Sequence, residues 1–139
     1  MTSNSQNLPP ELYRVVDANI NRLKEGIRVI EDIMRYKADN KILASELKSL
    51  RHQAQLPELT KLLLQSRDSV NDVLRASTKS EQQRSNVTSI ILANFKRAQE
   101  SARVLEEVCK LHAVQESEKF KTIRYKLYRL EKEIALNLL

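Results

Sequence analysis

The sequence has few of the residues that shape tight turns. Of its 139 residues, one is glycine, three are proline and none is tryptophan. A fold of many strands needs glycine or asparagine at its hairpins, so this composition argues against one. A chain of this length can close one hydrophobic core, and 41% of its residues are hydrophobic. We therefore expect a single all-α domain.

Cysteine and long apolar runs are equally scarce. Cys109 is the only cysteine, which excludes an internal disulfide framework and is typical of a reducing compartment. No run approaches the roughly 20 apolar residues of a membrane-spanning helix. Residues 1–8 lack the apolar stretch of a signal peptide and predict a flexible leader. These absences predict a cytoplasmic protein without a membrane partner.

The charged residues have a positive excess that is spread along the chain. The formal net charge is +6, which favours anionic partners such as nucleic acid or a phosphorylated small molecule. A nucleic-acid surface usually shows a concentrated basic stripe, often with aromatic residues for stacking. Here basic and acidic residues are mixed and only 4% of residues are aromatic, so we expect no nucleic-acid partner. A solvated charged surface accounts for part of the excess.

Apolar residues recur every three or four positions over most of the chain, as on the buried side of a helix. The pattern predicts long helices near 11–37 and 79–112, each followed by a shorter one, the last at about 117–136. The apolar positions of the long helices form two seams: Val16, Ile20, Leu23, Ile27, Ile30 and Met34, then Ile91, Phe95, Ala98, Ala102, Leu105 and Cys109. No segment reads as a strand.

Polar residues mark where these helices begin and where they are interrupted. Asn40 can cap the helix after the first long one, and Thr78 and Glu81 have the spacing of a capping box. Residues 66–80 are polar and irregular and predict a mobile loop. The chain thus divides into a first unit, 12–54, a connection that includes the loop, 55–80, and a second unit, 81–139.

The two units share polar residues as well as apolar ones. Residues of the first long helix match identical residues of the second at one constant offset. The identical pairs are Ala18 and Ala93, Asn19 and Asn94, Arg22 and Arg97, Glu25 and Glu100, Arg28 and Arg103, Val29 and Val104, and Glu31 and Glu106. Gly26 matches Ser101, and Arg51 matches Arg124 at an offset two positions shorter. The repeat predicts a duplicated long-helix/short-helix hairpin, giving a four-helix bundle with an approximate two-fold axis and an irregular central connection.

The repeated polar residues are the first candidate site. Ion pairs along a helix contribute only about 0.3–0.5 kcal/mol each. This favours charged residues, but it does not explain why the same residue types occur at matching positions of both units. Helical geometry places Asn19 and Arg22 on one flank of the buried seam, and Asn94 and Arg97 correspond to them. We therefore expect a shared polar cleft. Gly26 in mid-helix suits close approach of either a crossing helix or a ligand phosphate.

The predicted loop supplies the second candidate site. It carries Arg67, Asp68, Asp72 and Arg75, and Arg84 follows it. Arginine binds phosphate oxygens in pairs, and Mg²⁺ is usually held by one or two carboxylates together with substrate phosphates. An ordinary charged loop explains the spacing equally well.

An ordered series of residues runs through both sites. It consists of Asp17-Ala18-Asn19, Arg22, Glu25-Gly26, Arg28-Val29, Glu31-Asp32, Arg51, Arg67-Asp68, Asp72-Val73, Asn94, Arg97, Glu100 and Arg103-Val104-Leu105-Glu106-Glu107. Over about residues 12–131 the chain resembles the small single-function hydroxymethylpyrimidine phosphate kinases of bacterial thiamine biosynthesis. Those helical domains are often fused to thiamine phosphate synthase. In that family glycine often follows the Asp-Val pair, where Leu74 stands here.

The resemblance implies transfer of a phosphoryl group from ATP to 4-amino-5-hydroxymethyl-2-methylpyrimidine phosphate, with Mg²⁺ as cofactor. The acceptor phosphate, with a second pKa near 6, needs no strong general base at neutral pH. On this reading Arg67, Asp68 and Asp72 are catalytic, and Asp72 and Asp68 hold the metal. The residues expected to bind phosphate are Asn19, Arg22, Arg51, Arg84, Asn94, Arg97 and Arg124. We expect one repeat to serve the donor and the other the acceptor, with the loop closing over both.

Two other classes of protein remain open from the sequence. One is a non-catalytic helical module that docks on thiamine phosphate synthase and regulates it. The other is a different ATP-using bundle, such as a corrinoid adenosyltransferase-like protein. A docking module should expose a large apolar patch, whereas a kinase should show a cleft lined by the paired asparagines and arginines. The sequence leaves open the nucleotide preference, fusion to a further domain and the oligomeric state, a homo-oligomer included.

Overall fold

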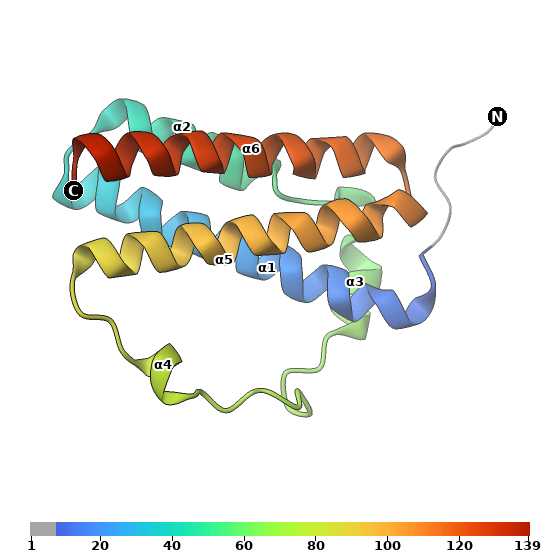
Figure 1. The fold of residues 1–139 in the computed structure, drawn as a ribbon. Helices are drawn as coiled ribbons and strands as arrows, with labels where there is room; N and C mark the ends of the chain where they lie inside the picture. Colours follow the sequence, from blue (N-terminus) through green and yellow to red (C-terminus); the bar gives the residue numbers. More distant parts are fainter. Residues whose placement is uncertain (1–7) are drawn as a thin grey trace.

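The computed structural model describes residues 8–139, and they form an all-α fold (Figure 1). The α-helices are α1 (Tyr13–Asp32), α2 (Lys41–Gln53), α3 (Thr60–Ser66), α4 (Lys79–Gln82), α5 (Val87–Val108) and α6 (Val114–Asn137). Short turns of other helical types occupy Pro10–Leu12, Ile33–Lys37, Pro57–Leu59 and Cys109–Leu111. No strand occurs within residues 8–139, so the predicted fold class is confirmed.

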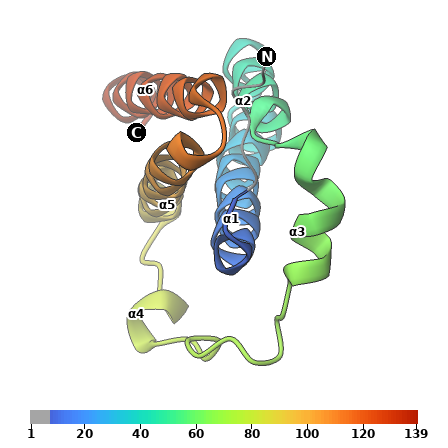
Figure 2. The same ribbon diagram turned by 90° about the vertical axis from the view of Figure 1, so that its right-hand side faces the viewer.

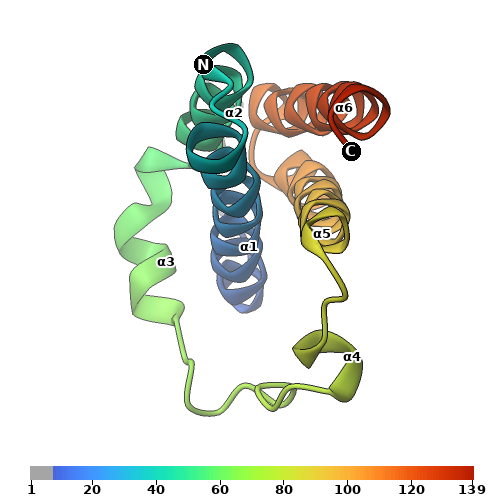
Figure 3. The same ribbon diagram turned by 90° about the vertical axis from the view of Figure 1, so that its left-hand side faces the viewer.

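The four longest helices form the bundle. α1 and α5 pack against each other, with α2 beside α1 and α6 beside α5. Figures 2 and 3 look along the bundle from its two ends and show α2 and α6 on the same side of the central α1–α5 pair. Arg129 of α6 pairs with Glu46 of α2. The shorter α3 packs on the flank of α1 that faces away from α5.

Residues 67–86, which we call the arch, leave the bundle after α3 and return to it at α5 (Figures 2 and 3). The arch contains α4 and passes the side of the α1–α5 pair that α2 and α6 leave uncovered. Nearly all of its described side chains are exposed. The irregular loop expected at residues 66–80 therefore forms most of the arch.

The core is built from the two predicted seams. Every seam residue of α1 and α5 and of the turns that follow them is buried, and Leu47 of α2 and Leu127 of α6 join them. Burial of apolar surface contributes roughly 25 cal/mol per Å², so this core is the main source of stability. Leu8, expected in a flexible leader, is also buried because its apolar side chain packs into the core; residues 1–7 lie outside the described residues. Of the helices in the described chain, none is both long and apolar enough to cross a membrane.

The single glycine lies where α1 and α5 approach most closely. A Cβ atom on Gly26 would stand 3.1 Å from the carbonyl oxygen of Asn94 and 3.4 Å from the Cβ atom of Ala98. The first distance is shorter than ordinary van der Waals contact, so a side chain at this position would push the backbone of α5 away by a few tenths of an ångström. Of the two explanations left open by the sequence, close helix packing accounts for Gly26.

Helix starts follow the predicted caps with two corrections. Asn40 Oδ1 accepts a hydrogen bond from the Leu43 N–H group at 3.0 Å, as predicted. Thr78 and Glu81 form a capping box, also as predicted, but α4 ends at Gln82. A second box, Asn86 with Ser89, starts α5 at Val87, so the expected unbroken helix near 79–112 is wrong at its beginning. The last helix begins at Val114 rather than near 117 and has 24 residues against 22 in α5, so the expected long-helix/short-helix order is wrong in the second half.

Candidate functional site

Each half of the bundle contains one buried ion pair between its two main helices, α1 and α2 or α5 and α6. In the first half, Arg51 Nε and Nη2 donate to the Glu31 carboxylate at 2.7 and 3.1 Å. In the second, Arg124 Nε and Nη2 both lie 3.0 Å from Glu106 Oε1. The glutamate side chains are 3% and 8% exposed. Matched positions of the sequence repeat therefore make matched contacts.

These pairs change the interpretation of Arg51 and Arg124, which the sequence assigned to phosphate binding. The hydrogen bond to Glu31 raises the pKa of Arg51 and keeps the pair charged. Arg124 also lies against the rings of Tyr125 and Tyr128, 5.0 and 5.8 Å from their centroids. In the structure Arg51 holds α2 to α1, and Arg124 holds α6 to α5. A phosphate contact by either stays a prediction.

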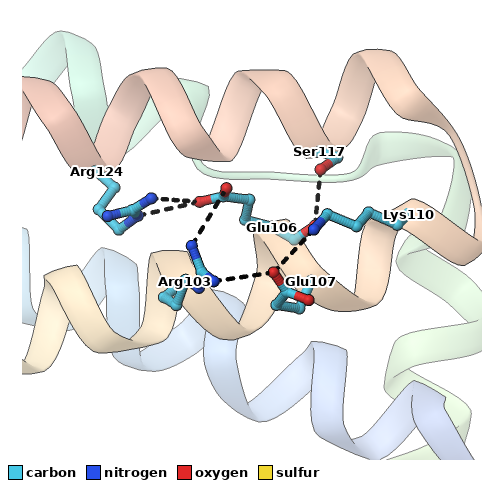
Figure 4. Close-up of polar contacts among 6 residues, drawn as sticks. All are labelled: Arg103, Glu106, Glu107, Lys110, Ser117 and Arg124. Carbon is cyan, nitrogen blue, oxygen red and sulfur yellow. Dashed lines mark hydrogen bonds and ion pairs between the residues drawn. The ribbon is translucent and has the colours of Figure 1, made fainter.

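Figure 4 shows the ion-pair network of the second half. Arg103 lies between two carboxylates, 3.7 Å from Glu106 and 3.2 Å from Glu107. Lys110 Nζ pairs with Glu107 at 2.9 Å. Ser117 Oγ donates to the backbone carbonyl of Glu106 at 2.7 Å, which ties the start of α6 to α5. Several of the repeated charged residues thus stabilise the bundle itself.

Asn19 and Asn94 use their side-chain amides in the same way. Nδ2 of each donates to the backbone carbonyl four residues earlier, that of Val15 or Ile90, at 2.8 Å. Neither Oδ1 atom receives a hydrogen bond from residues 8–139, so both can accept one from a ligand. The two asparagines make the same backbone contact, although Asn19 is buried and Asn94 is half-buried. The two-fold axis itself stays a prediction.

Arg22 and Arg97 differ from the other repeated arginines. Arg28 and Arg103 each pair with the acidic residue one turn later, at 3.1 and 3.2 Å. Arg22 and Arg97 are exposed and have no ion-pair or hydrogen-bond partner in the part of the chain that the structure describes. Their guanidinium groups are therefore available to an anionic ligand.

The helix crossing places these two arginines on the same side of the bundle. Gly26 faces α5, and the buried seam of α1 lies to one side of it. At about 100° per residue, Arg22 falls on the other side. Arg97 has the corresponding position on α5, next to Ala98, which Gly26 approaches. Helical geometry therefore places Arg22 and Arg97 on the side of the crossing away from the buried seams. The arch passes that side of the α1–α5 pair (Figure 2).

Arg67, where the arch begins, is fixed to α1 by Asp17. Its Nε and Nη2 donate to the two carboxylate oxygens of Asp17 at 2.8 and 2.7 Å, and these hydrogen bonds raise the pKa of Arg67. Asp17 is buried, whereas the Arg67 side chain is 45% exposed. Nη1 takes part in neither hydrogen bond to Asp17, so it can still bind an anion. The sequence analysis did not select Asp17 as a site residue. Its one signal is that the corresponding position of the second half holds Leu92, so this carboxylate is not part of the repeat.

Asp68, expected to be catalytic and a metal ligand, closes a turn in the arch. Its Oδ1 accepts from the N–H groups of Val70 and Asn71 at 3.1 and 3.0 Å, and its Oδ2 accepts from Asn71 Nδ2 at 2.8 Å. The hydrogen bonds from Asn71 lower the pKa of Asp68. Arg14 Nη2 donates to the Asp68 carbonyl at 3.4 Å and so links this turn to α1. Both carboxylate oxygens thus shape the arch.

Asp72 is the better candidate for a metal ligand. It is exposed, and only its Oδ1 accepts a hydrogen bond, from the Leu74 N–H group at 3.0 Å. Among residues 8–139, no three His, Cys, Asp or Glu side chains gather to hold a metal. A Mg²⁺ ion that arrives with substrate phosphates needs only one or two carboxylates, which Asp72 can supply. Arg84, further along, donates to the Gln83 carbonyl at 2.9 Å.

Two of the surface grooves lie elsewhere on the bundle. One, of about 580 Å³, is lined mainly by α2 together with Pro57 and Lys119. The other, of about 410 Å³, lies between α5 and α6 and includes Arg124. Neither groove is lined by Arg22, Arg67, Arg84 or Arg97. The expected gathering of these four arginines in one hollow stays a prediction.

Comparison with known proteins identifies the family. The model of the ThiD2 family matches residues 14–133, a range that includes Asp17, Arg67, Arg124 and the rest of the candidate site. The chain belongs to the ThiD2 family. No solved structure matches this ThiD2 family chain.

Curated relatives of this ThiD2 family chain are named thiamine-phosphate synthase. That of Thermosynechococcus vestitus is 35% identical over 95% of this chain and 39% of its own length. The Nostoc sp. relative is 36% identical over 93% and 37%, and the Synechocystis sp. relative 39% identical over 88% and 36%. The chain spans about two fifths of the length of these relatives. These matches link the family to thiamine biosynthesis.

Proposed function

We propose that this ThiD2 family chain is an ATP-dependent kinase that converts 4-amino-5-hydroxymethyl-2-methylpyrimidine phosphate to the diphosphate. Family membership and the names of the relatives support a role in thiamine biosynthesis. The observation that carries the kinase proposal is a pair of arginines without an ion-pair or hydrogen-bond partner among the described residues. Arg22 and Arg97 keep their charge free at the α1–α5 crossing, while the other repeated arginines pair with carboxylates of the protein.

The reaction brings two polyanions together, so positive charge and positioning are its main requirements. Arg22 and Arg97 supply cations from two helices, and Arg67 supplies a third whose orientation is set by Asp17. Asn19 and Asn94 offer free amide oxygens next to these arginines, which suit the hydroxyl or amino groups of the ligands. The terminal phosphorus of ATP is attacked by an oxygen of the acceptor phosphate, ADP leaves, and no strong base is required.

Mg²⁺ would be held by Asp72 on the protein side, with substrate phosphates completing its coordination. Asp68 fits this role less well because both of its oxygens already accept hydrogen bonds within the turn. When bound, the ion would neutralise phosphate charge. Movement of the arch toward the α1–α5 pair would exclude water, which competes as an acceptor of the phosphoryl group.

A coupled assay of ADP release, with ATP and the pyrimidine monophosphate, tests the proposal. Each of Arg22→Ala and Arg97→Ala should lower kcat/KM by about 10- to 100-fold, the loss expected for a charge-assisted contact. Arg28→Ala is the matched control on α1 and should change it by less than about threefold, because its partner Asp32 is exposed and belongs to the same helix. Absence of ADP release by the wild type, or equal effects of all three variants, would contradict the proposal.

The same assay tests whether the two halves of the bundle bind different substrates. Under the proposal, Arg22→Ala and Arg97→Ala raise the KM of different substrates, because one half serves the donor and the other the acceptor. If both variants raise the KM of the same substrate by similar amounts, the halves do not divide the two ligands in this way.

A further inference from the structure

The groove between α5 and α6 contains a buried acceptor without a donor. The groove has a volume of about 410 Å³ and is lined by Lys96, Gln99, Glu100, Arg103, Arg124 and Tyr128. Gln99 is 1% exposed, and its Oε1 atom has no hydrogen-bond partner among the described residues. Buried polar atoms are nearly always paired, and an unpaired one costs about 1–3 kcal/mol. A donor is therefore missing at this position.

The orientation of the Gln99 amide is fixed by its other end. Nε2 donates to Glu131 Oε1 at 2.9 Å. A rotation that exchanged the two ends of the amide would set the Gln99 oxygen against a carboxylate oxygen, which is repulsive. The end of the side chain that is left over is thus an acceptor. A ligand that satisfies it must carry an N–H or O–H group.

One aromatic ring, three positively charged side chains and the carboxylate of Glu100 line the groove around this acceptor. The Tyr128 side chain is 41% exposed, and its ring stacks edge-on against Tyr125 with centroids 6.2 Å apart. Lys96 is exposed and has no ion-pair partner within residues 8–139. Arg103, on the same rim, is also exposed and pairs only with acidic residues of its own helix. The groove thus combines a flat apolar face, a buried acceptor and flexible cations.

We propose that the α5–α6 groove binds the amino-substituted aromatic ring of a phosphorylated ligand. The ring packs on Tyr128, its amino group donates to Gln99 Oε1, and its phosphates extend past Lys96 toward Arg97, the next residue of α5 and part of the proposed phosphate site. The ligand reaches the enclosed oxygen by displacing the long side chains of the rim. This inference rests on the proposed function, since both of its substrates, the adenine nucleotide and the aminopyrimidine phosphate, have this chemistry.

The first half of the bundle has no equivalent of this groove chemistry. Lys24 occupies the position that corresponds to Gln99, and Gln55 the position that corresponds to Tyr128. The duplicated fold therefore provides the buried amide and the aromatic ring once. A single ring site would give the two otherwise similar halves different ligands.

Calorimetric titration of the full chain tests the groove without reference to turnover. The probes are ATP, the aminopyrimidine monophosphate, and for each an analogue that lacks the ring amino group. Tyr128→Ala should weaken binding of one amino ligand by about 5- to 100-fold, the usual range for loss of stacking on a ring. Tyr125→Ala is the matched control, because this neighbouring exposed tyrosine does not line the groove. It should bind both ligands like the wild type.

The amino group provides the second arm of the experiment. The wild type should bind the amino ligand that Tyr128→Ala weakens more tightly than the deamino analogue of that ligand. Gln99→Leu should abolish this preference. A merely structural role of Gln99 would not produce such a coupling. Whichever ligand shows the coupling identifies the source of the ring. Equal binding by Tyr128→Ala and Tyr125→Ala, or no amino preference in the wild type, overturns the groove assignment even if ADP release is observed. Coupling without ADP release supports the groove and contradicts the kinase.

Discussion

The bundle and the arch are stabilised in different ways. The bundle buries two continuous seams and closes each half with an ion pair whose carboxylate is less than a tenth exposed. The arch exposes Val70, Val73 and Leu74 by 74%, 95% and 84%, and its turns depend on hydrogen bonds between near neighbours. Regions with few buried contacts open at low free-energy cost, and binding loops are drawn from them. We therefore expect the bundle to be rigid and the arch to move.

The proposed phosphate site lies where these two regions meet. Arg22 and Arg97 are presented by helices of the rigid part. Arg67 and Asp72 are presented by the arch, and Asp17 connects the two parts. A site of this kind can admit its ligands while the arch is open and complete its set of charges when the arch moves. Experiments that separate the two regions therefore also test the site.

The largest effect is expected from the buried ion pairs of the bundle. Glu31→Gln and Glu106→Gln should each lower the free energy of unfolding by about 3 kcal/mol, because each leaves a mostly buried arginine without its carboxylate. Chemical denaturation monitored by circular dichroism measures the loss. Similar losses in the two variants would support equal roles for the two halves.

Asp32→Asn is the control for these variants, since it removes an exposed pair on the same helix and should change stability by less than about 0.5 kcal/mol. If Glu31→Gln or Glu106→Gln behaves like this control, the matched pairs do not stabilise the bundle.

A smaller effect is expected where the arch is attached. Asp17→Ala removes the carboxylate that holds Arg67 but leaves the arginine free to be solvated, so it should cost only about 1 kcal/mol of global stability. The arch should open more often, and limited trypsin digestion after Arg67, Arg75 or Arg84 should speed up by about tenfold. In the proposed reaction, kcat/KM should fall by a similar factor.

Arg14→Ala is the companion variant, because it removes the weaker link, 3.4 Å long, between α1 and the arch. It should accelerate cleavage less than Asp17→Ala does. Equal cleavage rates for the wild type and Asp17→Ala would show that Asp17 does not hold the arch.

Much of the bundle could be predicted from the sequence because its signals are local and periodic. The seam positions recur at helical spacing and are all buried, and Asn40 caps α2 as its residue type predicts. The break between α4 and α5 was missed because a capping box at Thr78 looks like the start of any helix. The second capping box, Asn86 with Ser89, lacks the Glu or Gln of the usual pattern. Its signal for a new helix start was therefore too weak to divide the predicted helix in two.

The candidate site was less predictable because its key contacts join distant residues. The repeat showed that Arg51, Arg124, Arg22 and Arg97 recur, but it could not separate arginines that bind Glu31 and Glu106 from those that are free. That distinction depends on which helices pack together. Arg67 and Asp17 are far apart in the sequence, and no local pattern predicts their contact.

The smallest effect is expected inside the arch, at the turn closed by Asp68. Hydrogen bonds from Asn71 lower the pKa of Asp68 from its ordinary value of 3.8, so the turn favours the ionised carboxylate. The stabilisation is therefore fully present above pH 3.8 and is lost as the pH falls through the lowered pKa. In an NMR titration, the amide signals of Val70 and Asn71 should shift with a midpoint below 3.8. Asp68→Asn should remove this step and leave the amide signals of α1 and α5 unchanged, because the turn opens without the bundle. A midpoint at or above 3.8 would contradict the lowered pKa of Asp68. Movement of the α1 and α5 signals in the same titration would show that the turn does not open independently of the bundle.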